Sequence, residues 1–163
     1  MKHYIIYLST AEHLMNNDEL SVILEQSRTS NYNHGITGML LYVEGIFASV
    51  ADRSIESAVT GRFMQIIEGS KDDVECLFDK IKQDPRHVNV ITLENAPSRA
   101  RYFETWQMGF TALSISDLQD NAGFFRPDIL FTAGNDSTGK HPLNFLKSFY
   151  LRGQSQQTVF QHE

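Results

Sequence analysis

The sequence predicts an α+β fold, in which a β-α-β-β-α-β order of elements forms a ferredoxin-like layer and a fifth strand is added to it. Short apolar runs bounded by Gly, Asn and Pro alternate with two segments whose apolar residues recur at helical spacing. The length of 163 residues suits one such domain with a short extension. We expect both helices on one face of an antiparallel sheet and a C-terminal helical tail on the other face.

Five segments have the apolar, β-branched or aromatic character of strands. They are residues 4–9, 36–43, 63–68, 88–93 and 102–111. Turn-forming residues separate them: Gly45 follows the second segment, Gly69 follows the third, and Asp84-Pro85 precedes the fourth. The residue before a proline is driven out of the helical conformation, so Asp84 also predicts the end of a helix.

Both predicted helices have recognisable starts and apolar faces. Asn16, Asn17 and Asp18 can cap the first helix, and a turn is predicted for residues 31–35 just after it. Ser70 followed by Asp73 resembles a capping box at the start of the second helix. The residues on the two faces are Leu20, Ile23, Leu24 and Ser27 in the first helix and Val74, Leu77, Phe78 and Ile81 in the second.

Residues 48–62 interrupt what should be a tight hairpin between the second and third strands. The segment is small, polar and weakly periodic, so we interpret it as an inserted loop within a domain of residues 1–112. We expect it to bulge outward, because long surface loops cost little, whereas a one-residue slip in pairing would turn Gln65 to the opposite face. Residues 113–163 are interpreted as a helical extension that covers the open sheet face through Leu143, Leu146, Phe149 and Tyr150.

Composition limits the classes of partner. The 14 Lys and Arg against 20 Asp and Glu give a net charge of −6, which disfavours a nucleic-acid-binding surface. No apolar run approaches the roughly 18 residues that a membrane-spanning helix needs. The lone Cys76 excludes an internal disulfide and a multi-cysteine metal site. We therefore expect a cytoplasmic protein with no metal, no nucleic-acid partner and no membrane association.

A few polar and aromatic side chains stand out from the predicted core. Tyr7 and Gln65 lie in the middle of apolar strands, Asn31 lies just past the first helix, and Trp106 and Met108 share one face of the fifth strand. A buried Gln must form hydrogen bonds or cost about 1–3 kcal/mol, and its amide both donates and accepts. Two interpretations remain open from these residues alone: contacts to a bound polar planar ligand, or a Tyr–Gln pair that satisfies itself.

Five stretches, taken together and in this order, resemble the BLUF family of blue-light sensors that use flavin adenine dinucleotide (FAD). They are YIIYLS at 4–9, NYNHGITGMLLY at 31–42, FMQIIEG at 63–69, DPRH at 84–87 and RYFETWQMGF at 101–110. The resemblance covers about residues 2–112, and the tail is similar to that of short single-domain members. One departure is His34, where many members have a second asparagine.

The resemblance implies a flavin held non-covalently between the two helices, either FAD or, as alternatives, FMN or riboflavin. It implies that Tyr7 is the photoactive tyrosine, that Gln65 lies between it and the flavin, and that Asn31 bonds the edge of the ring. Trp106 and Met108 match the pair that responds to the signalling state. The positions implied to contact the ring or its ribityl and phosphate end are Lys80, Asp84, Arg86 and His87.

The sequence thus predicts a photoreceptor and not an enzyme. We expect a light-driven change in Tyr–Gln–flavin hydrogen bonds to signal through contacts with a protein partner, and we expect a homo-oligomer. The alternative is a light-independent ferredoxin-like binding or regulatory module, which applies if the insertion has destroyed the pocket. An acylphosphatase-type enzyme is disfavoured, because no phosphate-cradling loop is visible near residues 9–13.

Overall fold

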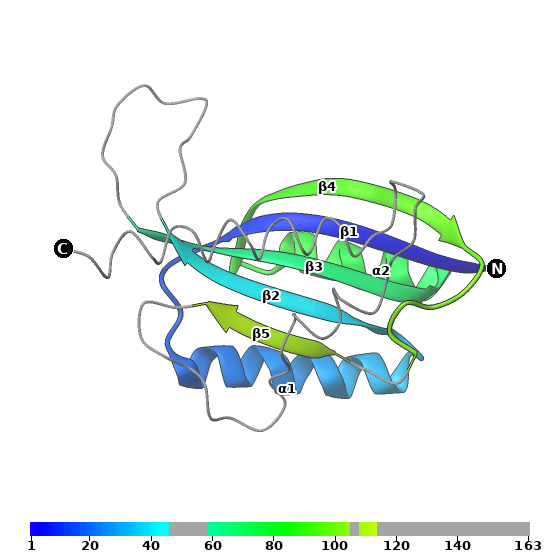
Figure 1. Cartoon of the computed structure of the whole chain (residues 1–163), viewed down its shortest axis with the longest axis horizontal. Helices are drawn as coiled ribbons and strands as arrows, with labels where there is room; N and C mark the ends of the chain where they lie inside the picture. Colours follow the sequence, from blue (N-terminus) through cyan, green and yellow to red (C-terminus); the bar gives the residue numbers. More distant parts are fainter. Residues whose placement is uncertain (46–58, 105–107, 114–163) are drawn as a thin grey trace, which may run out of the picture.

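The predicted order of elements is confirmed (Figure 1). A computed structural model describes residues 1–45, 59–104 and 108–113 of the chain. The elements are β1 (Lys2–Ala11), α1 (Asn17–Asn33), β2 (Thr37–Gly45), β3 (Thr60–Ser70), α2 (Lys71–Gln83), β4 (His87–Ser98) and β5 (Gly109–Leu113). The expected helical tail on the second sheet face lies outside the described residues.

The five strands form one sheet in the order β4-β1-β3-β2-β5 (Figure 1). All neighbours are antiparallel except β2 and β5, which run parallel. The expectation of an antiparallel sheet is therefore wrong for the fifth strand. Strand β4 lies at one edge of the sheet, and β5 lies at the opposite edge, beside β2. Both β2 and β5 run in the direction opposite to that of β4.

The fifth strand is also shorter than predicted. It begins at Gly109 and not at Tyr102. The amides of Tyr102 and Phe103 donate to the side chain of Glu68, at 2.8 and 2.7 Å, and not to a neighbouring strand. Because these two amides donate to a side chain and not to a neighbouring strand, Tyr102 and Phe103 do not extend β5.

Capping residues fix the start of each helix as predicted. Asn16 caps α1: its Oδ1 accepts from the Glu19 amide at 2.9 Å, and its own amide donates to Glu19 Oε2 at 2.8 Å. Ser70 caps α2 and accepts from the Asp73 amide at 3.2 Å. The predicted apolar faces are confirmed by the burial of Leu20, Ile23, Leu24, Val74 and Phe78.

Asn31 lies in the last turn of α1, so the prediction that it lies just past the helix is wrong. Its carbonyl accepts hydrogen bonds from the amides of His34, at 3.2 Å, and Ile36, at 2.9 Å. These bonds keep the chain in contact with the helix until Gly35, whose φ of +61° turns it away into β2. As a result the Asn31 side chain is held by a helix and not by a loop.

The insertion does not shift the strand register. Tyr7 pairs with Gln65 across β1 and β3, and Leu40 pairs with Gln65 across β2 and β3. Thr60 to Arg62, predicted as the end of the insertion, belong to β3, where Thr60 faces Gly45. The rest of the predicted insertion falls mainly in residues 46–58, which are outside the described part of the chain.

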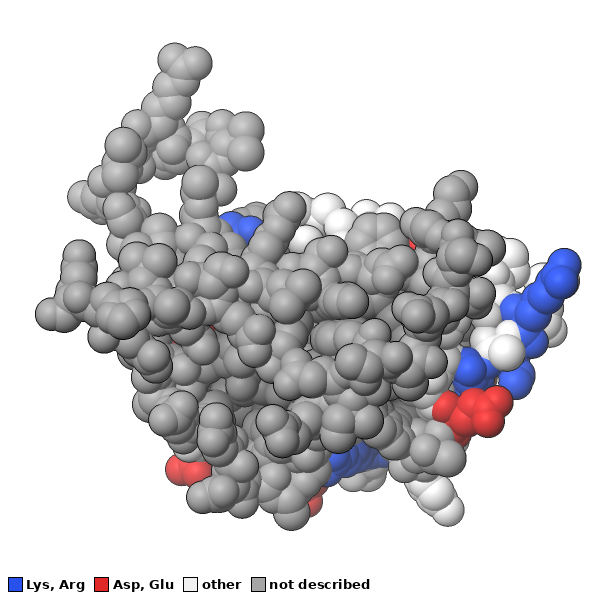
Figure 2. Space-filling view, viewed as in Figure 1, with Lys and Arg blue, Asp and Glu red and all other residues white. Residues whose placement is uncertain are grey.

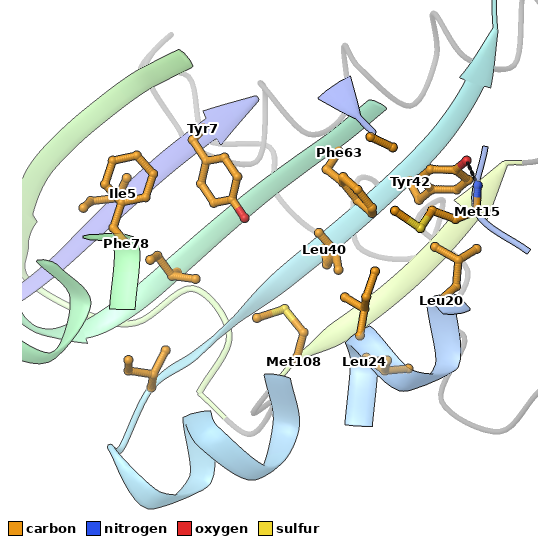
Figure 3. Packing of buried hydrophobic residues seen from close by; sticks show 14 of the residues in the cluster. Ile5, Tyr7, Met15, Leu20, Leu24, Leu40, Tyr42, Phe63, Phe78 and Met108 are labelled. Carbon is orange, nitrogen blue, oxygen red and sulfur yellow. Dashed lines mark hydrogen bonds between the residues drawn. The ribbon is translucent and has the colours of Figure 1, made fainter. Parts of the chain in front are cut away.

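Apolar side chains line both faces of the sheet. Toward the helices, Ile5, Tyr7, Leu40 and Phe63 pack with residues of α1 and α2 such as Phe78 (Figure 3). The second face carries its own cluster, made of Tyr4, Ile6, Met39, Leu41, Met64, Ile66 and Phe103. This alternation along each strand places Tyr7 and Gln65 on the helix side.

Figure 2 shows one face of the molecule, on which charged side chains of the described part are visible near the margin. Its Lys and Arg side chains stand in separate groups near the margin, with acidic side chains beside them at one edge. Neither of the described helices has the length and apolar character needed to cross a bilayer.

We expect the segment that joins β2 to β3 to be dispensable for the fold. Gly45 and Thr60 face each other, so an Asn-Gly turn in place of residues 46–59 can close a two-residue hairpin without moving either strand. The replacement should keep the far-UV circular dichroism and the melting temperature of the full chain. As a control, deleting 46–62 removes strand residues and should lower the melting temperature. A loss of sheet structure in the Asn-Gly variant would contradict this expectation.

Candidate functional site

A cleft of about 150 Å³ lies between α1 and α2, with the sheet as its floor. Helix α1 contributes Gln26 and the buried Asn31, the sheet contributes Leu40 and Gln65, and α2 contributes Lys80. Leucine and isoleucine side chains from both helices complete its walls. The cleft therefore combines apolar walls with three side-chain amides and with basic side chains.

A buried hydrogen bond joins Gln65, on the floor of the cleft, to Tyr7 of the neighbouring strand β1. The Tyr7 hydroxyl donates to Gln65 Oε1, and both side chains are almost fully buried, with exposed fractions of 0% and 4%. The same Gln65 amide donates from Nε2 to Met108 Sδ at 3.4 Å. Burial, reinforced by the charge of Asp84, raises the pKa of Tyr7, so its phenol stays protonated.

Met108 immediately precedes β5, so the prediction that it lies within the fifth strand is wrong. Its carbonyl accepts a hydrogen bond from Arg28 Nε of α1 at 3.1 Å. The thioether is thus presented to Gln65 by a backbone that is tied to α1. Trp106, predicted to share a face with Met108, lies outside the described residues.

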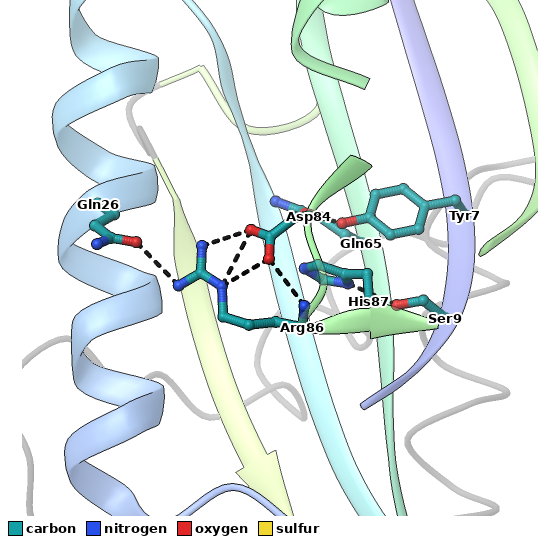
Figure 4. A network of polar contacts seen from close by, with 7 residues as sticks. All are labelled: Tyr7, Ser9, Gln26, Gln65, Asp84, Arg86 and His87. Atoms are coloured by element: carbon teal, nitrogen blue, oxygen red, sulfur yellow. Dashed lines mark hydrogen bonds and ion pairs between the residues drawn. The ribbon is translucent and has the colours of Figure 1, made fainter. Parts of the chain in front are cut away.

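An ion-paired arginine, Arg86, lines the cleft (Figure 4). Arg86 donates to both Asp84 oxygens, with the shortest contact from Nη2 to Oδ2 at 2.6 Å, and Nη1 donates to Gln26 Oε1 of α1 at 2.9 Å. The hydrogen bonds from Arg86 hold the pKa of Asp84 below its usual value. The contact with Gln26 connects α1 to the turn that follows α2.

His87 packs behind this pair, between the cleft and Tyr7 (Figure 4). Its ring lies 4.8 Å from the Phe63 ring and 6.0 Å from the Tyr7 ring, centroid to centroid, and its Nδ1 shares a 2.7 Å hydrogen bond with Ser9 Oγ. Burial lowers the pKa of His87 to about 4, so the ring is neutral at pH 7. It therefore adds no positive charge beside Tyr7.

The partly buried His87 should make the protein less stable in mild acid. The pKa of this histidine is 6.5 in the unfolded chain, whereas in the folded protein its pKa is about 4. Between these values the unfolded state binds more protons, so the free energy of unfolding falls as pH falls, by at most about 1.4 kcal/mol per pH unit. Urea unfolding at several pH values should show a smaller slope in His87→Gln.

The matched control is Ser9→Ala, which removes the hydrogen-bond partner but keeps the titrating ring. This variant should retain the slope of the parent protein between pH 6.5 and pH 4. Equal slopes for the parent and His87→Gln would show that other groups dominate the acid response.

The structure brings the predicted site residues of its described part around one cleft. Asn31, Gln65 and Lys80, and with them Asp84, Arg86 and His87, line it. Tyr7 and Met108 contact Gln65 from either side. The sequence analysis did not identify Gln26, Arg28 or Ser9 as site residues. Of these, only Gln26 could have been identified from the sequence, because it lies next to the predicted apolar face of α1.

The sequence matches one family model. The BLUF model, described as sensors of blue-light using FAD, matches residues 3–52 and 54–109. The chain belongs to the BLUF family. Members of this family are blue-light flavin sensors, and the matched region includes both helices and the Tyr7–Gln65 pair.

Curated relatives share this region as part of much longer proteins. The chain is 35% identical over 99 residues to photoactivated adenylate cyclase subunit beta of Euglena longa, covering 61% of this chain and 10% of that protein. It is 28% identical over 112 residues to the blue light- and temperature-regulated antirepressor BluF of Escherichia coli K12, covering 63% and 25%. The chain thus spans between a tenth and a quarter of these relatives, and it matches their BLUF region.

Solved BLUF proteins have the same fold. The dark-state structure of BlrB, a BLUF protein, is 28% identical and aligns with a TM-score of 0.54 over 68% of this chain and 72% of BlrB. The ground state of BlsA, also 28% identical, aligns with a TM-score of 0.52 over 70% and 66%. BlrP1 of Klebsiella pneumoniae, at 24% identity and a TM-score of 0.65 over 94% of this chain and 33% of that one, supports the fold alone.

The chemistry of the cleft fits a flavin. A flavin ring is planar and apolar on its faces, and its edge carries carbonyl and N–H groups that side-chain amides can both accept from and donate to. The BLUF cleft supplies amides at Asn31 and Gln65 and apolar walls from both helices. Lys80, at the rim, supplies the positive charge that suits a phosphate.

Proposed function

We propose that this chain is a blue-light photoreceptor that holds FAD non-covalently between α1 and α2 and switches through the Tyr7–Gln65 hydrogen bond. The observation that carries the proposal is this buried hydrogen bond, which Tyr7 makes to Gln65 on the floor of a cleft lined by polar side chains suited to a flavin. FMN or riboflavin are the alternative ligands, because both contain the same ring.

The cleft residues divide into two binding roles. Asn31 and Gln65 bond the polar edge of the ring, while Lys80 and Arg86 lie where a ribityl or phosphate group can leave the cleft. Asp84 holds Arg86 in place through its two carboxylate oxygens. Cys76 is exposed on α2 and does not line the cleft, so no thiol is available there for a covalent adduct.

The bound flavin supplies light absorption and, once excited, the capacity to take an electron from a nearby donor. Tyr7 would be the donor: its hydroxyl proton can move from Oη to Gln65 Oε1 along the existing hydrogen bond, and the electron and the proton would both return to Tyr7 when the excitation has decayed. Rotation of the Gln65 amide exchanges its donor and acceptor ends, so Nε2 turns toward Tyr7 and leaves Met108 Sδ. A thioether is a weak acceptor, and this contact therefore costs little to break.

The light-induced change at Gln65 reaches the rest of the protein through the neighbours of Met108. Its carbonyl is bonded by Arg28 of α1, and the next residue begins β5, the edge strand beside β2. A changed contact at Gln65 therefore acts on an edge of the sheet where another protein can bind. We further propose that residues 1–112 form the sensor, that residues 113–163 form a helical extension on the second face, and that the chain signals as a homo-oligomer to a protein partner.

The proposal is tested with the visible spectrum of the purified protein before and after blue light. We expect a flavin spectrum in the dark and a reversible shift to longer wavelength in the light. Acid precipitation should release the flavin into the supernatant, where mass spectrometry distinguishes FAD, FMN and riboflavin. A protein that stays colourless after incubation with each flavin would support the light-independent binding module instead.

A further inference from the structure

We propose that the hydrogen bond between Gln26 and Arg86 is a strap that controls how fast flavin enters and leaves the cleft. Arg86 Nη1 donates to Gln26 Oε1 at 2.9 Å, and this bond joins α1 to the turn between α2 and β4. The inference rests on the proposed function, because it assigns the strap a role in the exchange of the proposed ligand.

The Arg86 side chain is fixed by its own turn. Its Nε and Nη2 donate to the two carboxylate oxygens of Asp84, at 2.9 and 2.6 Å, and the Arg86 amide donates to Asp84 Oδ1 at 2.9 Å. A guanidinium that binds a carboxylate through two of its nitrogens has a fixed plane and orientation. Nη1 is the remaining nitrogen, and this arrangement directs it toward α1 and Gln26 (Figure 4).

The fixed arginine makes the strap stronger than most contacts between exposed side chains. Such contacts are weak largely because two flexible side chains must be held in one geometry. Here the Asp84 carboxylate already holds one of the two, so the strap restricts mainly the Gln26 side chain. The donor is also charged, and hydrogen bonds of that kind are stronger than those between neutral groups.

The strap lies on the solvent side of the cleft. Gln65 and Leu40, on the floor, are 4% and 1% exposed, whereas the Arg86 side chain is 35% exposed and Gln26 is an exposed residue. Both strap residues line the cleft, one from α1 and the other from the turn after α2. The strap therefore joins the two walls of the cleft between its floor and the solvent.

A bond in this place opposes separation of the walls. A planar ring bound between them must enter and leave through a local opening of the cleft. Because the strap joins two groups of the protein and includes no ligand atom, its loss should make opening more frequent for entry and for release alike. Both rates should then rise together, and the dissociation constant, which is their ratio, should hardly change.

The test compares two substitutions of Gln26 with a control on the same helix, each in the full chain. Gln26→Ala removes the acceptor and leaves the Asp84–Arg86 pair intact, and alanine does not weaken a helix. Gln26→Glu places a carboxylate against Arg86 Nη1 and should strengthen the strap. The control Thr29→Ala makes a similar truncation one turn further along α1, at an exposed residue that does not line the cleft.

The probe is riboflavin, which has no phosphate for the charge of Gln26→Glu to repel. Its entry is followed in the dark by stopped-flow fluorescence, and its release is followed by a chase with excess FAD. We expect both rates to be about fivefold faster in Gln26→Ala, as the loss of one hydrogen bond allows, with the dissociation constant within about twofold of that of the parent. Both rates should fall in Gln26→Glu, and Thr29→Ala should match the parent.

Three outcomes overturn the inference. The first is unchanged rates in either substitution of Gln26. The second is faster release alone with a larger dissociation constant, which would make Gln26 a direct contact of the ligand. The third is an equal acceleration in Thr29→Ala, which would mean that a loosened α1 is the cause.

The proposed function fails in a different way. A parent protein that exchanges riboflavin in the dark but shows no red shift with FAD contradicts the photoreceptor, and the measured rates still decide whether the strap controls exchange. A parent protein that binds no flavin contradicts both.

Discussion

Gln65→Leu should bind flavin and show no red shift under blue light. Leucine has a similar volume but neither donates nor accepts a hydrogen bond, so the Tyr7 hydroxyl loses its acceptor and Met108 Sδ loses its donor. The buried hydroxyl left behind costs about 1–3 kcal/mol of stability. Asn31 and the apolar walls of the cleft remain, and binding should therefore persist. The measurement is the light-minus-dark absorption spectrum of the loaded protein.

Tyr7→Phe is the companion variant. It keeps the aromatic ring, whose centroid lies 5.3 Å from that of the Phe78 ring, and removes only the hydroxyl. Phenylalanine is much harder to oxidise than tyrosine and has no proton to give to Gln65. We expect bound flavin, no normal red shift and stronger flavin fluorescence, because the fastest quenching route is lost.

Asn31→Ala is the matched control for both variants. It removes a buried amide from the cleft wall without touching the Tyr7–Gln65 bond. Flavin binding should weaken by about 1 kcal/mol, the usual value of one hydrogen bond, and the molecules that retain flavin should shift normally. A normal, reversible red shift in Gln65→Leu would contradict the switch and assign it to another group.

The parts of the fold that the sequence predicted depend on neighbours in the chain. Asn16 and Glu19 are three residues apart and cap α1 by themselves, as Ser70 and Asp73 cap α2. The contact between Tyr7 and Gln65 could be predicted from the sequence because each residue interrupts an apolar strand, and both strands lie inside the sheet and not at its edges. Local patterns of this kind survive folding because tertiary packing agrees with them.

The parts that it did not predict depend on residues distant in sequence. The direction of β5 follows from which edge of the sheet is open, and no residue of the strand encodes that choice. Gln26 meets Arg86 only when α1 and the turn after α2 are side by side. Glu68 looks like an ordinary polar end to a strand until the amides of Tyr102 and Phe103 are brought to it.

The second large effect is expected at a glycine in the sheet. Gly38 of β2 lies beside the backbone of β3, and a Cβ added there would collide with the Ile66 carbonyl oxygen, with the Ile66 carbon at 3.1 Å and Ile67 Cα at 3.3 Å. These are backbone atoms, which cannot rotate away as a flexible side chain could. Gly38→Ala must therefore push β2 from β3 two residues before Leu40 pairs with Gln65. We expect a loss of about 3 kcal/mol in the free energy of unfolding.

Gly35→Ala is the control that separates close approach from backbone conformation. Gly35 has a φ of +61°, and nothing lies within 4 Å of an added Cβ. Alanine there should lower the free energy of unfolding only by the strain of the left-handed conformation, about 1–2 kcal/mol. Urea unfolding should rank Gly38→Ala as the less stable variant, with reduced flavin retention because the floor of the cleft is displaced. If Gly35→Ala is the less stable of the two, the contact between β2 and β3 at Gly38 is not what limits substitution.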